Sequence, residues 1–152
     1  MNLTQKEINL LSDLKGQEQL CVEKYTKYMD TANDPCLKNI FENIKNTEAT
    51  HLATITKIMN GEQVAAGMPP SAADSVTQCR ASEVSEQQKK DDAFLCKDAL
   101  SMEKHVSSLY DTCIFEFPNP ALRDALAHIQ KEEQNHGEMI YSYMAKNGMY
   151  SG

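Results

Sequence analysis

Apolar side chains recur at alternating steps of three and four residues in four long stretches of the chain, the spacing that lines one face of an α-helix. The four predicted helices cover residues 4–32, 35–60, 85–117 and 120–147. Pro35 and Pro120 each begin a stretch, which suits the first turn of a helix because amide groups there have no helical partner. The pattern therefore predicts an all-α protein.

The two halves of the chain repeat each other without a gap under a shift of 85 residues, which takes Leu10 to Leu95. Further matching pairs are Asp13 with Asp98, Tyr25 with Tyr110, Leu37 with Leu122, Ile44 with Ile129, Ile55 with Ile140 and Met59 with Met144. We interpret residues 1–152 as a single domain made of a duplicated helical hairpin. The parts are a first hairpin at about 4–60, a linker at about 61–84 and a second hairpin at about 85–147.

The linker is long enough to run the length of a helical bundle, because extended chain covers about 3.3 Å per residue. We therefore expect a four-helix bundle with a long crossover between its second and third helices.

Ionisable residues interrupt the apolar face of every predicted helix, where the packing of a bundle would favour leucine or isoleucine. They are a single glutamate in the first and third helices and a Glu-x-x-His pair in the second and fourth: Glu18, Glu103, Glu48, His51, Glu133 and His136. Counted at a rise of about 1.5 Å per residue, Glu18 and Glu48 lie at nearly equal distances from the turn between their helices. Glu103 and Glu133 repeat this relation, and both members of a Glu-x-x-His pair project from one helix face. Six polar groups are therefore expected to meet inside the bundle.

Four carboxylates packed together repel one another unless cations balance their charge or their pKa values rise. Two divalent ions would supply four positive charges, so these six residues predict a site for two metal ions. Oxygen and imidazole ligands suit iron or manganese, and the lack of thiolate ligands argues against a structural zinc site. The alternative is a set of buried polar side chains that satisfy only one another, as relics of a lost site. Because the halves are repeats, the two metal positions are expected to be equivalent.

Tyr25 and Tyr110 each follow one of the single glutamates by seven residues and share its helix face. Their hydroxyl groups either pack in the core without a further role or donate hydrogen bonds to the metal ligands. With a long crossover, Tyr25 would lie on the side of His136 and Tyr110 on the side of His51.

Several other polar or unusual residues are given no chemistry. His105 and His128 have no histidine at the corresponding position of the first half, so we expect them at the surface. Gly16 and Gly137 stand inside predicted helices, where glycine costs about 1 kcal/mol relative to alanine, and the sequence gives no firm reason for either.

The cysteines are odd in number and scattered, without a Cys-x-x-Cys pair: Cys21, Cys36, Cys79, Cys96 and Cys113. This usage excludes a rubredoxin-type iron centre and, at a chain start without the features of a secretion signal, predicts reduced thiols. We accordingly expect an intracellular, cytoplasmic protein. Its net charge of −7 and its lack of a basic stripe or a long apolar run argue against nucleic acid and membranes as partners.

The arrangement of the six candidate ligands resembles the ferritin-like superfamily of di-metal carboxylate proteins, most closely the rubrerythrins. The resemblance covers nearly the whole chain and implies a ferritin-like four-helix bundle with a di-iron or dimanganese centre. It further implies a reaction with dioxygen or hydrogen peroxide, of the peroxidase or the ferroxidase type. The chain lacks a rubredoxin module, so electrons would come from an external donor.

A narrower resemblance is to spore coat protein F-like proteins, which contain a Coat F domain. The residues that carry it are Asn119-Pro120-Ala121-Leu122-Arg123 and Tyr143-Met144-Ala145-Lys146-Asn147-Gly148-Met149-Tyr150. It implies a place on or near the spore and spore coat proteins as partners, and we also expect a second copy of the chain as a partner in a homodimer. The competing interpretation is a structural coat or assembly protein whose metal site is bracing or vestigial.

Overall fold

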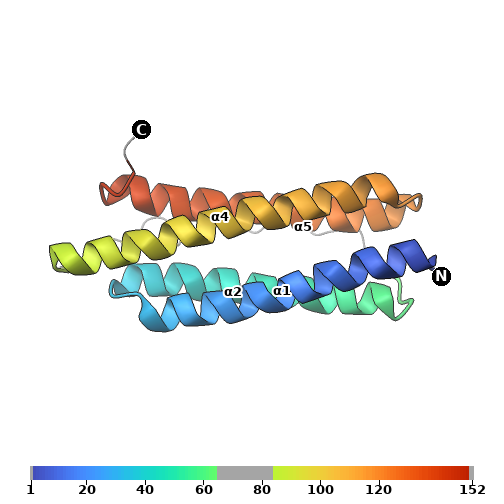
Figure 1. Ribbon diagram of the computed structural model, residues 1–152, viewed down its shortest axis with the longest axis horizontal. Helices are drawn as coiled ribbons and strands as arrows, with labels where there is room; N and C mark the ends of the chain where they lie inside the picture. Colours follow the sequence, from blue (N-terminus) through green and yellow to red (C-terminus); the bar gives the residue numbers. More distant parts are fainter. Residues whose placement is uncertain (1, 65–83, 151–152) are drawn as a thin grey trace.

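Four α-helices form the bundle in the computed structural model, which describes residues 2–64 and 84–150 (Figure 1). The helices are α1 (Gln5–Thr31), α2 (Pro35–Met59), α4 (Glu86–Glu116) and α5 (Pro120–Lys146). The described residues contain no β-strand. Every helix boundary lies within one residue of its predicted position, so the predicted all-α four-helix bundle is confirmed.

Local sequence fixes the start of each helix. The side chains of Thr4 and Ser85 each accept a hydrogen bond from the backbone amide three residues on, in capping boxes at the starts of α1 and α4. At α2 and α5 the first helical residue is proline, and the preceding Asp34 and Asn119 accept bonds from first-turn amides. Because the starts are fixed by local contacts, the height of each ligand along its helix follows from its residue number.

The helices pair as two antiparallel hairpins, with α1 packed on α4 and α2 on α5 (Figure 1). The start of α4 lies beside the turn between α1 and α2, where the Asp92 carboxylate accepts hydrogen bonds from the backbone amides of Asn33 (2.8 Å) and Asp34 (3.0 Å). The green end of α2 lies at the opposite end of the bundle. The end of α2 and the start of α4 therefore lie at opposite ends of the bundle, as a long crossover requires. Residues 65–83 of the expected crossover lie outside the described part of the chain.

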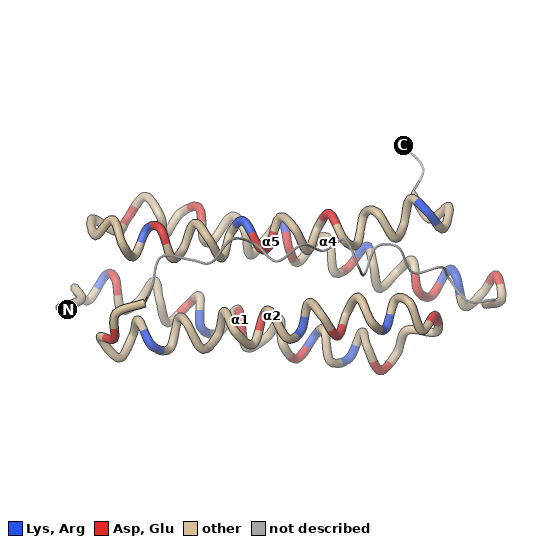
Figure 2. The backbone as a smooth tube through the Cα atoms, turned by 180° about the vertical axis from the view of Figure 1, so that it is seen from behind, with Lys and Arg blue, Asp and Glu red and all other residues tan. Residues whose placement is uncertain are grey.

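The apolar faces of all four helices meet in one core. Its aromatic part includes Tyr25, whose ring lies 5.5 Å from that of Tyr28 and 5.9 Å from that of Phe41, measured between centroids. Basic and acidic residues are interspersed along the helices (Figure 2). Within the described segments, no helix combines the length and the apolar character needed to cross a membrane.

The expectation of reduced thiols is wrong for Cys36. Cys36 is disulfide-bonded, whereas Cys21, Cys96 and Cys113 are buried free thiols and Cys79 lies outside the described residues. A disulfide depends on the distance between two Cα atoms in the folded chain, which cysteine spacing does not reveal. Burial raises the pKa of Cys96 to about 12 and that of Cys113 to about 11, so these thiols stay protonated and act as packing residues.

Candidate metal centre

All six predicted ligands lie inside the bundle, and each exposes at most 4% of its surface. They form two overlapping groups, within each of which the ligand atoms lie within 4.8 Å of one another. The first group is Glu18, Glu48, His51 and Glu133, and the second is Glu48, Glu103, Glu133 and His136. Glu48 and Glu133 belong to both groups, so the structure brings the six residues together as two adjoining sites with two shared carboxylates.

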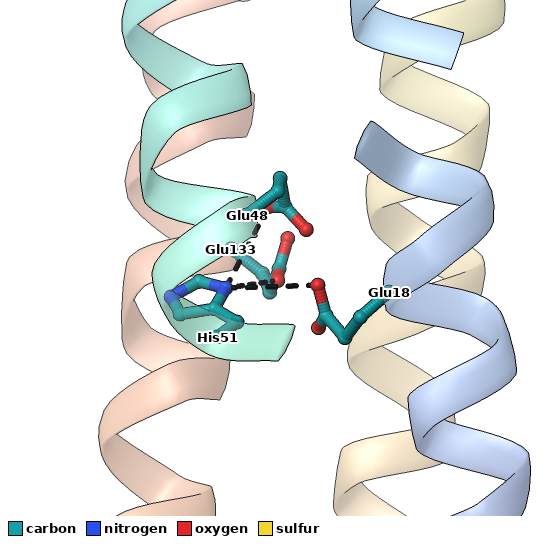
Figure 3. Close-up of side chains that lie close together, drawn as sticks. All are labelled: Glu18, Glu48, His51 and Glu133. Carbon is teal, nitrogen blue, oxygen red and sulfur yellow. Dashed lines mark hydrogen bonds and ion pairs between the residues drawn. The ribbon is translucent and has the colours of Figure 1, made fainter. Parts of the chain in front are cut away.

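His51 directs its Nδ1 atom toward three carboxylates that come from three different helices (Figure 3). The Nδ1 atom lies 3.0 Å from Oε1 of Glu133, 3.7 Å from Oε1 of Glu48 and 3.9 Å from Oε2 of Glu18. One nitrogen and several carboxylate oxygens thus converge on a small volume, as the ligands of a metal ion do.

His136 makes the corresponding approach in the second group. Its Nδ1 atom lies 2.9 Å from Oε1 of Glu48, 3.4 Å from Oε1 of Glu103 and 3.5 Å from Oε2 of Glu133. The rings of His136 and His51 are stacked, with centroids 6.0 Å apart. The repeat in the sequence therefore appears as an approximate two-fold relation between the two groups.

Most of these ligands carry a buried polar atom that makes no well-aligned hydrogen bond to a described residue, although Nδ1 of His136 and Oε1 of Glu48 lie 2.9 Å apart as an ion pair. The atoms are Oε2 of Glu18, Oε1 and Oε2 of Glu48, Oε2 of Glu103, Oε2 of Glu133 and Nδ1 of His136. Buried polar atoms without partners cost about 1–3 kcal/mol each and are rare in folded proteins. All of them belong to the six candidate ligands, and a cation in each group would accept their lone pairs. The donor set therefore fits two metal ions.

The pKa values show how the cluster carries its charge without metal. Burial raises the pKa of Glu18 and of Glu103 well above the usual range, and neighbouring carboxylates raise both further. Burial also acts on Glu48, but the nearby imidazoles of His136 and His51 outweigh it and hold its pKa well below the usual value. Both histidines have raised pKa values because the carboxylates around them outweigh burial. Protons thus take the place of cations, and metal binding would release them.

The two tyrosines join the site through hydrogen bonds that cross between the hairpins. The hydroxyl of Tyr110 donates to Oε1 of Glu18 at 2.6 Å, and that of Tyr25 donates to Oε1 of Glu103. Each tyrosine lies on the side of the bundle expected for a long crossover. In both glutamates the bond occupies Oε1 and leaves Oε2 without a partner, so the tyrosines orient these carboxylates toward the cluster. Burial and the adjacent glutamate raise the pKa of both hydroxyls, which keeps them protonated as donors.

Sequence reasoning missed Glu132, which adjoins Glu133 on α5. Oε1 of Glu132 lies 3.3 Å from Nε2 of His51 and 3.0 Å from Nε2 of His128. A carboxylate on the outer nitrogen of a ligating histidine fixes its tautomer and makes it a better metal ligand. His128, expected at the surface, keeps 22% of its side chain exposed and contacts Glu132, whereas His105 is exposed as expected. The spacing of four residues between His128 and Glu132 was the available signal.

This contact makes the two halves of the site unequal. The residue that corresponds to Glu132 in the first hairpin is Thr47, which has no carboxylate and donates its hydroxyl to the carbonyl oxygen of Asn43 at 3.2 Å. The expectation of two equivalent metal positions therefore does not extend to the residues around the ligands.

Replacing Glu132 by glutamine should weaken metal binding at the His51 position about 10- to 100-fold and affect the His136 position much less, because of the two candidate histidine ligands only His51 contacts Glu132. Stepwise metal titration by calorimetry would resolve the two affinities. Thr47→Val is the matched control and should leave both affinities unchanged. An equal loss at both positions in Glu132→Gln would show that the carboxylate acts through the overall charge instead of through His51.

Comparison with known protein families gives one finding: residues 91–151 match the Coat F domain. The matching segment contains α5 and most of α4, and with them Glu103, Glu133 and His136. No curated protein and no solved structure matches the chain. The second hairpin is thus similar to a Coat F domain, and it carries half of the candidate ligands.

Proposed function

We propose that this protein is a ferritin-like di-iron protein that reduces hydrogen peroxide or dioxygen with electrons from an external donor. The observation that carries the proposal is the pair of adjoining ligand groups that share Glu48 and Glu133. Two ferrous ions held there would supply the electrons that the oxidant accepts. Manganese fits the same ligands and would instead favour disproportionation of peroxide.

The six candidate ligands would hold such a centre in two groups. Glu48 and Glu133 belong to both ligand groups and would help to hold both ions, and each half adds one further glutamate and one histidine: Glu18 with His51, and Glu103 with His136. Six ligands shared by two ions leave coordination positions for an oxidant. The six candidate ligands are almost wholly buried, which strengthens the electrostatic interactions among them.

The match of residues 91–151 to the Coat F domain supports an association with the spore coat. It also favours a second candidate function, that of a structural coat or assembly protein in which bound metal ions brace the bundle. The two candidates differ in turnover, because a structural protein would hold metal without consuming an oxidant.

The test is to offer ferrous iron to the purified chain without oxygen, and then to add hydrogen peroxide together with an artificial reductant. We expect two iron ions per chain and catalytic loss of peroxide. Loading with one ion or none would contradict the dinuclear centre. Full loading without turnover would support the structural candidate over the enzyme.

A further inference from the structure

A pocket of about 590 Å³ opens between α4 and α5 and reaches the candidate metal centre from outside the bundle. The buried Glu103 and Glu133 form its inner end, and the mainly apolar wall includes Leu100, Gly137 and the half-exposed Tyr141. Its volume falls within the range of about 300–1,000 Å³ that is typical of sites for small organic molecules. Hydrogen peroxide alone would fill only a small part of it, since a water molecule occupies about 30 Å³.

Gly137 keeps this pocket open. The corresponding residue of the first hairpin is Leu52, so the two halves differ here in a whole side chain. A Cβ atom at Gly137 would lie 3.9 Å from Cδ2 of Leu100, an ordinary contact, so close packing does not require the glycine. Glycine inside a helix costs about 1 kcal/mol relative to alanine. An open pocket beside the metal ligands explains why a side chain is absent at this position.

The composition of the pocket selects a kind of ligand. Most of its exposed surface is apolar, which disfavours a charged ligand body, and the exposed Lys104 and Glu138 bring one charge of each sign to the lining. Glu103 and Glu133 both belong to the ligand group of His136, so a polar group at the inner end would lie against that half of the centre. The ligand that fits is uncharged, with an apolar body and one polar end.

We propose that the pocket binds organic hydroperoxides, with the alkyl or aryl body between α4 and α5 and the hydroperoxide group against Glu103 and Glu133. The inference rests on the proposed function and names its substrate class. Reduction would break the O–O bond: the hydroperoxide accepts two electrons, which iron held by the candidate ligands would supply, together with two protons, and yields an alcohol and one water. The external donor then returns two electrons.

The first test compares cumene hydroperoxide with hydrogen peroxide as substrates of the iron-loaded protein. Gly137→Leu introduces the residue that the first hairpin carries and should lower kcat/KM for cumene hydroperoxide about tenfold or more relative to that for hydrogen peroxide. Gly137→Ala should lie between wild type and Gly137→Leu. Gly16→Ala is the matched control, because a Cβ there meets nothing within 4 Å, and the ratio should not change. A Gly137→Leu protein that folds and keeps the wild-type ratio overturns the inference.

The second test does not depend on turnover. The chain contains no tryptophan, so Tyr141→Trp places a single tryptophan at the pocket, which can be excited selectively over the tyrosines. Cumyl alcohol, the product, should change the fluorescence of this tryptophan saturably in the metal-free protein. The change should be lost when Gly137→Leu is combined with Tyr141→Trp in the same chain. Absence of saturable binding overturns the inference even if hydrogen peroxide is reduced. Binding of the alcohol without reduction of either peroxide overturns the proposed function, and with it the assignment of hydroperoxides as substrates.

Discussion

Replacing Glu133 by alanine is expected to abolish the binding of both metal ions, whereas His136→Ala should weaken mainly one of them. The reason is the geometry of the two ligand groups, both of which contain Glu133, while His136 belongs to only one. Loss of a carboxylate that belongs to both ligand groups should weaken metal binding by more than about 100-fold, which exceeds the effect expected when a residue that only contacts a ligand is lost. Metal content per chain after dialysis, together with titration affinities, measures both effects.

Glu48→Ala should behave like Glu133→Ala, because Glu48 is the other shared carboxylate. Glu42→Ala removes an exposed carboxylate from the same helix as Glu48 and should leave metal content unchanged, which controls for the overall charge. If Glu133→Ala retained one ion at wild-type affinity, Glu133 would serve a single site and the two groups would not form a dinuclear centre.

Much of this arrangement could be predicted because it depends on interactions within one helix or on the repeat. Residues such as Pro35 and Pro120 mark helix starts in the sequence, and the structure begins α2 and α5 at these positions. The candidate ligands could be identified because a glutamate in an apolar stripe, such as Glu18, is conspicuous where burial of an unpaired charge is costly. The height at which the six ligands meet followed from residue counts along helices with fixed ends.

The remaining features depend on how helices lie beside one another, which neither periodicity nor repeat contains. Glu132 lies next to the apolar stripe of α5, and only the lateral position of α2 brings His51 within reach of it. The pocket at Gly137 likewise forms between the surfaces of α4 and α5. The disulfide of Cys36 requires two Cα atoms to lie close together in the folded chain, which the spacing of cysteines does not contain. Each of these features distinguishes one half of the molecule from the other, so the repeat could not predict it.

The metal-free protein should melt at a higher temperature when Glu18 and Glu103 are replaced by leucine and Tyr25 and Tyr110 by phenylalanine in the same chain. The two glutamates expose 0% and 3% of their surface, and burial raises their pKa values, so their charged forms destabilise the metal-free core. A buried leucine contributes about 1.5–3 kcal/mol relative to an exposed one. The tyrosines must change as well, because their hydroxyls donate to these glutamates and would be left without acceptors.

An orphaned buried hydroxyl costs about 1–3 kcal/mol, so two of them would offset much of the gain from the leucines. The variant with only the two leucines should therefore melt closer to the metal-free wild type than the variant with all four changes. In a chain of this size about 1 kcal/mol corresponds to roughly 2–4 °C in Tm, so scanning calorimetry can separate the variants. Without Glu18 and Glu103, neither leucine variant should bind two ions.

Wild-type protein should in turn gain thermal stability when metal is added, because ligands that bind only the folded state stabilise it by mass action. The variant with all four changes should show a high Tm that does not respond to metal. This combination separates the two proposed roles of the glutamates, since the same side chains that would hold the ions destabilise the core without them. If the fourfold variant melted below the metal-free wild type, contacts within the metal-free protein would already offset the free-energy cost of burying Glu18 and Glu103. The cluster would then be a set of polar groups that satisfy one another, with no need of metal.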